Sequence, residues 1–248
     1  MPRKALGVGA CLRRGLLAGL VAGVLVGAFH LLASEPIFER AVRLEAALHG
    51  VHGAPLVSRG GQRIGLIFAA VLYGLALGGV FGFFWLILAR RMRAGTSWTS
   101  ALRLAFFGFL TLWLIPFLKY PSNPPGVGTP ESIGLRTAAY LGMVAISIAA
   151  TALVWTTSGR LSGAQPHVRQ VVVGGAYILV IAFAYVVLPG GPDAGPVPAQ
   201  LVWSFRMMSA AGQALLWLAV GAGFGLLTIR AEGEPKASLV PVAAGASE

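Results

Sequence analysis

Potential metal ligands gather in one short segment of this 248-residue chain. Imidazole and carboxylate groups together form a ligand set for borderline divalent ions such as cobalt, nickel or zinc. Three of the four histidines and three of the eight acidic residues fall within 23 positions: His30, Glu35, Glu39, Glu45, His49 and His52. The set is open and lacks cysteine, as suits a transport site that an ion must leave as well as enter. The segment is therefore a candidate binding site for a divalent metal ion.

The spacing of these residues also allows a plainer interpretation. Glu35 and Glu39 are one helical turn apart, so both side chains can turn toward His30. Equally, Glu39 can simply pair with Arg43, four residues later on the same helix face. His49 and His52 would then lie in an ordinary exposed loop. Spacing alone leaves the metal site and the plain ion pair both open.

The residues from 34 to 50 have the pattern of a short amphipathic helix. Pro36 suits the first turn of a new helix, and Glu35 suits its positive end. Apolar residues recur on one face at intervals of four, three and four: Ile37, Ala41, Leu44 and Leu48. We expect this helix to lie on the outer membrane surface, within the first outer loop.

The composition around this segment indicates a membrane protein. Hydrophobic residues make up 56% of the chain and charged residues only 11%, whereas soluble domains have about 25% charged residues. Six apolar runs are long enough, or nearly so, to cross a bilayer as helices. They cover residues 15–33, 64–88, 101–118, 137–157, 170–188 and 207–229. The sequence therefore predicts an all-α integral membrane protein with one polytopic domain (1–230), followed by a disordered cytoplasmic tail (231–248).

The distribution of lysine and arginine predicts the orientation. With the N-terminus inside, inside segments hold twelve of the nineteen basic residues and outside segments hold seven. This asymmetry places both termini in the cytoplasm by the positive-inside rule. The net charge of +11 is then a topology signal rather than a sign of nucleic-acid binding. We expect a multi-pass protein of the bacterial cytoplasmic (inner) membrane whose solvent is the lipid bilayer.

Glycines at spacing four mark three of the six predicted helices. Small residues at this spacing let helix backbones approach closely in lipid. The glycines are Gly15, Gly19, Gly23 and Gly27 in the first helix, Gly74, Gly78 and Gly82 in the second, and Gly221 and Gly225 in the sixth. The pattern favours tight structural packing, and the alternative is that these thin helices slide or rock as a gate.

The second outer loop, FLKYPSNPPGVGTPESIGLR (117–136), is stiff because its four prolines fix φ and remove backbone donors. Thr129 is expected to cap the fourth helix, with Pro130 in its first turn. Such a loop can hold four polar residues at fixed positions near the first outer segment: Lys119, Asn123, Glu131 and Arg136. We interpret them as pathway or gating candidates, with a rigid structural tie as the alternative.

Catalysis is poorly supported. The sequence contains no phosphate-binding glycine-rich lysine motif and no HExxH zinc motif. Polar side chains inside membrane spans are costly and therefore notable, and besides His30 the notable ones are Arg206 and Gln213. Neither forms a recognisable catalytic set, so we expect a protein that is not an enzyme.

Four ordered pieces of the sequence resemble the CbtA family of predicted cobalt transporter subunits. They are RGLLAGLVAG, EPIFERAVRLEAA, VSRGGQRIGLIFAAVLYGLALGGVFG and PFLKYPSNPPGVGTPESIGLRTAAY, of which the last is the most specific. The resemblance covers residues 13–157 strongly and the rest by hydropathy. It implies a membrane subunit for Co2+ uptake serving cobalamin synthesis, with Ni2+ possible as cargo and no permanently bound cofactor. It also implies a small single-span, histidine-rich partner of the CbtB type.

The residue pattern and the resemblance together give a hypothesis for the route of the ion. Hydrated Co2+ would be gathered by Glu35, Glu39 and the nearby histidines, and would then pass His30 between the glycine-lined helices. Lys119 and Arg136 would pair with outer carboxylates in one state and release them in another. The alternative is a structural or assembly subunit that does not itself transport.

Overall fold

The computed structural model describes residues 7–50, 57–88, 95–161, 163, 165–191 and 195–233, and the described chain is all helical. Within these residues, six helices are long and apolar enough to cross a membrane, which makes this a multi-pass membrane protein and agrees with the predicted number of spans. The elements are α1 (Val8–Phe29), π-turn η1 (His30–Ser34), α2 (Glu35–His49), α3 (Arg59–Leu88), α4 (Ser97–Phe109), π-turn η2 (Leu110–Leu114), α5 (Ile115–Lys119), 3₁₀ turn η3 (Pro130–Ser132), α6 (Ile133–Arg160), α7 (Pro166–Val187) and α8 (Ala199–Gly233).

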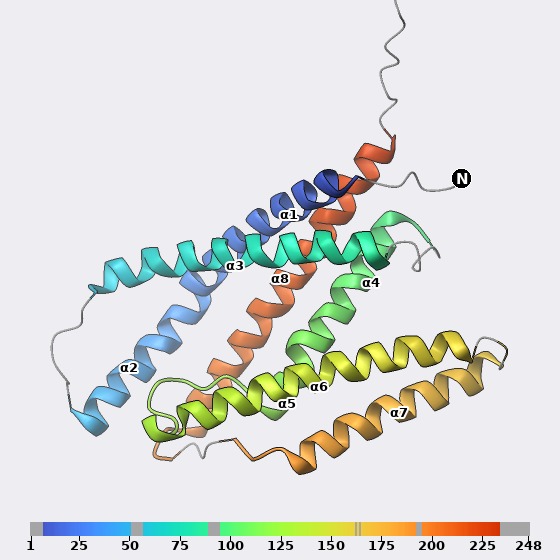
Figure 1. Ribbon diagram of the computed structural model, residues 1–248. Helices are drawn as coiled ribbons and strands as arrows, with labels where there is room; N and C mark the ends of the chain where they lie inside the picture. The colour runs from blue at the N-terminus through green and yellow to red at the C-terminus, as the bar shows by residue number, and fades with distance from the viewer. Residues whose placement is uncertain are drawn as a thin grey trace, which may run out of the picture.

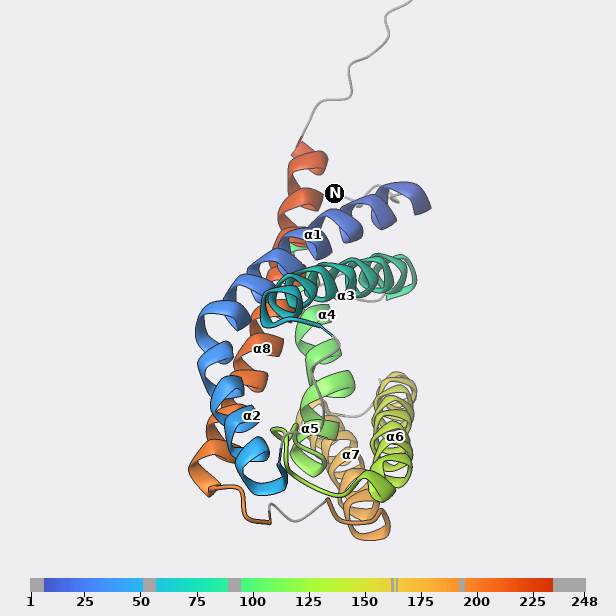
Figure 2. The same ribbon diagram turned by 90° about the vertical axis from the view of Figure 1, so that its left-hand side faces the viewer.

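The predicted amphipathic helix is α2, but it does not stand apart from the first span. It continues α1 through the π-turn η1, so that helical structure runs unbroken from Val8 to His49. Figures 1 and 2 show this long helix bending between α1 and α2. The apolar face of α2 is partly covered by protein: Ala41 is buried, and Leu44 packs on a small cluster formed by Val127, Val197 and Val202. The sequence suggested a break because Pro36 suits a helix start, whereas the π-turn accommodates the proline within a continuing helix.

The glycine seams are close helix contacts. α1 runs along α3 (Figure 1), and a Cβ atom added at Gly15 or Gly19 would overlap the backbone of Gly78 or Gly74. On α8, a Cβ at Gly221 would meet Ala105 of α4. The structure therefore confirms tight packing along these faces, and no room for an ion remains along the α1–α3 seam in this conformation.

Helices α1, α3, α4 and α8 share a hydrophobic core whose buried aromatic rings come from α3 and α8. The Phe224 ring lies 5.2 Å from the Phe81 ring and 5.1 Å from the Trp85 ring, measured between centroids. The α6–α7 hairpin stands to one side of this bundle and contacts it through η2 and α5 (Figures 1 and 2). The start of α1 and the end of α8 lie at the same end of the molecule (Figure 1), as an even number of spans requires. The side that faces the cytoplasm stays a prediction.

α8 extends to Gly233, so the predicted tail begins inside the helix at residue 231. Residues 234–248 lie outside the described part of the chain.

Candidate functional site

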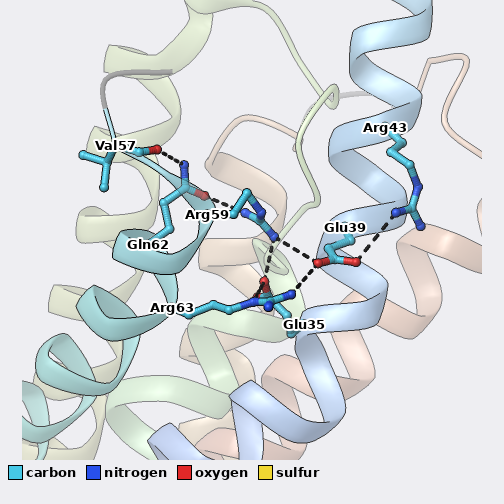
Figure 3. Close-up of polar contacts among 7 residues, drawn as sticks. All are labelled: Glu35, Glu39, Arg43, Val57, Arg59, Gln62 and Arg63. Atoms are coloured by element: carbon cyan, nitrogen blue, oxygen red, sulfur yellow. Dashed lines mark hydrogen bonds and ion pairs between the residues drawn. The ribbon is translucent and has the colours of Figure 1, made fainter. Parts of the chain in front are cut away.

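Two of the predicted ligands, Glu35 and Glu39, lie in a cluster of carboxylates and arginines between α2 and α3 (Figure 3). Arg59 Nη2 donates to Glu35 Oε1 at 2.6 Å, and Arg63 Nε donates to the same oxygen at 3.1 Å. Arg63 Nη2 also donates to Glu39 Oε1 at 2.6 Å. On α2 itself, Arg43 lies 3.6 Å from the other oxygen of Glu39, so the predicted pair within the helix is confirmed. We call these five residues the carboxylate–arginine cluster.

The local sequence explains why this cluster forms. Glu35 and Glu39 are four apart near the start of α2, and Arg59 and Arg63 are four apart at the start of α3. Residues four apart lie on one helix face, so the two pairs present matching charges when the helix starts lie side by side. Arg59 is held further by Gln62, whose Oε1 accepts from its Nη1 at 2.5 Å, and by the Phe38 ring, 5.5 Å from its guanidinium carbon.

A pocket of about 460 Å³ borders the cluster, with Glu35, Glu39 and Arg63 in its lining. The Glu35 side chain is only 13% exposed, whereas Glu39 is 31% exposed. Three arginines surround the two carboxylates, so the cluster carries a formal charge of about +1. A divalent cation would be repelled by this arrangement as it stands, and it could use the carboxylates only after arginines had moved away.

His30 faces a different neighbour. Its Nδ1 lies 2.8 Å from Ser34 Oγ, and its ring packs edge-on against Phe29. The imidazole also lies against α8, where a Cβ added at Gly212 would overlap it. His30 therefore belongs to the α1–α8 contact in this conformation, while the two glutamates face α3.

Of the three remaining predicted ligands, the structure describes the side chain of Glu45. Glu45 lies against Gly126. Gly126 belongs to the predicted second outer loop (117–136), which we call the proline-rich loop. His49 ends α2, and its side chain, like the whole of His52, lies outside the described residues. Within the described residues, no three histidine, cysteine or acidic side chains come close enough together to hold a metal ion. The metal site stays a prediction.

Lys119 and Tyr120 of the proline-rich loop hold the end of α7. Lys119 Nζ donates to the carbonyl oxygens of Tyr185 at 2.6 Å and Leu188 at 3.1 Å. A cation suits this position because the last carbonyls of a helix lack partners. Tyr120 donates its hydroxyl to Pro189 O at 2.6 Å. Burial raises the pKa of the Tyr120 hydroxyl, in the direction that favours its protonated, donating form.

Arg136 and Asn123 fix the rest of the loop. Arg136 donates to the carbonyl oxygens of Val127 and Thr129 at 3.4 and 3.3 Å. Asn123 Oδ1 accepts from Arg206 Nη2 of α8 at 2.8 Å. Within the described residues, neither Lys119 nor Arg136 forms an ion pair with a carboxylate, so these contacts correspond to the rigid tie that the sequence left open. Their gating role stays a prediction.

The start of α6 differs slightly from the expectation. Thr129 precedes the short turn η3, and its hydroxyl lies 3.4 Å from Ser132 Oγ rather than bonding a backbone N–H. Ser132 is the residue before α6. Glu131 is exposed in η3.

A second pocket, of about 410 Å³, lies between this loop, α6 and α8. Arg136 and Arg206 both line it, together with Tyr120 and Asn123. The Nε atoms of both arginines are buried and have no hydrogen-bond partner among the described residues.

Sequence reasoning missed Arg59, Arg63 and the role of Arg206. The matching intervals of four in the glutamate and arginine pairs were a usable signal for the first two, because helices joined by a short connection tend to lie antiparallel. No sequence signal connects Arg206 to Asn123, which is 83 positions away.

The comparisons with known proteins agree with this architecture. Residues 8–229 match the family model described as probable cobalt transporter subunit (CbtA), which confirms the resemblance and extends it over all six spans. No curated protein and no solved structure matches the chain. Because the match covers most of the 248 residues, the chain belongs to the CbtA family of probable cobalt transporter subunits.

Proposed function

We propose that this protein is the membrane subunit of an uptake system that brings Co2+ across the bacterial inner membrane for cobalamin synthesis. The observation that carries the proposal is the family match over residues 8–229. The six candidate spans support it, since they supply the membrane scaffold that transport needs. A small, histidine-rich, single-span protein of the CbtB type would deliver or receive the ion.

The carboxylate–arginine cluster is the proposed entry point for the ion. Glu35 and Glu39 are carboxylates at a pocket of about 460 Å³, and Arg59 and Arg63 occupy them in this conformation. Capture of Co2+ then requires exchange: the metal replaces the arginines as the counter-charge of the two carboxylates. The arginines act as an internal competitor, which keeps affinity low enough for the ion to leave again.

The experiment is accumulation of radiolabelled cobalt in cells without their own importers. The chain is expressed alone, with the small histidine-rich partner, and as the His30→Ala, Glu35→Gln, Glu39→Gln triple variant. The matched control is Glu232→Gln, which removes a carboxylate at the other end of the chain. We expect uptake with the native chain and the control, loss in the triple variant, and competition by excess Ni2+, whose ligand preferences are close to those of Co2+.

Full uptake by the triple variant would contradict the entry point. Absence of uptake in every combination, with the protein verified in the membrane, would favour the alternative of a structural or assembly subunit. That alternative has an observation in its favour, because both carboxylates are already neutralised by arginines and the glycine seam is closed.

The exchange mechanism has its own test. Arg63→Gln removes the arginine that donates hydrogen bonds to both carboxylates, while Arg59, which also lies within ion-pair distance of both, remains. We expect equilibrium binding of Co2+ to the purified protein to become tighter, because one of the two competing cations is gone. Unchanged or weaker binding would show that the arginine does not compete with the metal.

A further inference from the structure

The second pocket combines two arginines without a carboxylate partner. Arg136 of α6 and Arg206 of α8 both line it, and no ion pair to an acidic side chain is formed by either within the described residues. This is the opposite of the carboxylate–arginine cluster, where each of the two glutamates is in ion pairs with arginines. Half-buried positive charges of this kind are costly unless a counter-charge reaches them.

Most donors of the two guanidinium groups remain available. Each guanidinium has five N–H donors in a planar fork. Together they make three hydrogen bonds in the described part of the chain, to Val127 O, Thr129 O and Asn123 Oδ1. The two bonds of Arg136 are long, at 3.4 and 3.3 Å. Both Nε atoms are shielded from solvent and have no acceptor in the part of the chain that the structure describes, so an acceptor from a ligand would satisfy them.

The stiff loop presets the geometry of this pocket. Lys119 and Tyr120 tie the loop to the end of α7, and Asn123 ties it to α8. These contacts hold Arg136 and Arg206 beside a space of about 410 Å³ before any ligand arrives. A preset pair of guanidinium forks suits a phosphate group, whose several oxygens accept paired N–H donors.

We infer that this pocket binds a phosphate group between Arg136 and Arg206. The group belongs either to the headgroup of an anionic phospholipid or to free phosphate, since both present the same oxygens. The inference does not depend on the proposed entry point, because it uses none of the residues proposed to capture the ion.

The test uses the purified full chain and two probes. Equilibrium binding of radiolabelled inorganic phosphate is measured in nanodiscs of phosphatidylcholine, and retention of phosphatidylglycerol is measured by native mass spectrometry. The variants are Arg136→Gln and Arg206→Gln, and the control is Arg160→Gln, which removes an exposed arginine at the far end of α6. We expect binding to one site, a loss of about tenfold to a hundredfold in each variant, and no change in the control.

Binding of inorganic phosphate in phosphatidylcholine would assign the site to free phosphate. Retention of phosphatidylglycerol alone would assign it to the lipid headgroup, and either result supports the inference. If a glutamine variant fails to fold, Arg136→Lys and Arg206→Lys replace it in the test, because they keep the positive charge. They should still weaken binding, because lysine lacks the paired donors of the guanidinium group. The inference is overturned if neither probe binds or if the variants bind like the native chain. It is also overturned if binding appears only after Asp193→Asn: Asp193 lies outside the described residues, two positions after Gly191 of the pocket lining, and this result would identify its carboxylate as the counter-charge.

Discussion

The two π-turns, η1 and η2, have the same backbone geometry but different neighbouring side chains. In η1 the Glu35 N–H bonds to His30 O, and in η2 the Ile115 N–H bonds to Leu110 O. Each turn is followed at the same interval by a proline, Pro36 or Pro116. Because proline has no N–H and its ring crowds the carbonyl four residues earlier, a widened turn lets the helix continue past it.

The side chains around the two turns differ completely. η1 leads into Glu35 and Glu39, which meet the arginines of α3 at a pocket. η2 lies within an aromatic stack, where the Trp113 ring lies 5.4 Å from Phe109 and 4.2 Å from Phe117. A π-turn is thus no evidence of a site by itself, since here one accompanies polar groups and the other accompanies packing. The chemical role of each turn depends on the side chains around it, and four variants test this difference.

Phe117→Ala should have the largest effect on stability. The Phe117 side chain is nearly buried and stacks on Trp113, so its removal leaves a cavity beside η2. We expect the free energy of unfolding to fall by about 3 kcal/mol, the low end of the range for such truncations in soluble proteins. The cost is at the low end because an apolar side chain gains less by burial in protein when the solvent is lipid rather than water. Thermal unfolding in lipid–detergent micelles measures it. Phe106→Ala, at a 59% exposed position of α4, is the control, and an equal loss in the control would show that η2 is not a packed turn.

Gly212→Ala should have the next largest effect on stability, because the added methyl group would crowd η1. The added Cβ would overlap the His30 imidazole, and overpacking of this kind costs about 2 kcal/mol. Gly175→Ala is the control, since a Cβ there meets no atom within 4 Å. His30→Ala combined with Gly212→Ala should recover part of the loss in a double-mutant cycle. Additive losses would mean that His30 does not pack on α8.

The sequence predicted the spans well because their signal is local. Runs of apolar residues identified all six helices, and glycines at spacing four identified the α1–α3 seam. The π-turn at His30 was not predictable in the same way: Pro36 permits a helix start or a continuing helix, and only packing against α8 and the proline-rich loop decides between them.

The candidate site was predicted only in its composition. Glu35 and Glu39 lie on one face of α2, as their spacing predicted, but they face Arg59 and Arg63 of α3 rather than His30. The path of the connection between α2 and α3 is not given by the sequence. Lys119 was expected near carboxylates and instead holds the end of α7, because helix-end carbonyls 66 and 69 positions away are acceptors that no spacing reveals. Long-range polar contacts of this kind depend on how the helices are arranged.

Glu35→Gln and Glu39→Gln should have the smallest effects, and salt should reduce them further. Glutamine keeps the size of the side chain and removes the charge that faces Arg59 and Arg63. Partly exposed ion pairs contribute about 0.2–1 kcal/mol, so we expect Glu35→Gln to fall near the upper end and Glu39→Gln lower, in line with their 13% and 31% exposure. Unfolding is measured at low and at high salt, because salt screens these pairs.

Thr111→Val is the matched change at η2, where the hydroxyl lies 3.0 Å from that of Thr151, and its cost in stability should not depend on salt. If the glutamate and threonine variants responded to salt alike, the charges at η1 would have no part in holding α2 to α3, and the contrast between the two turns would reduce to packing alone.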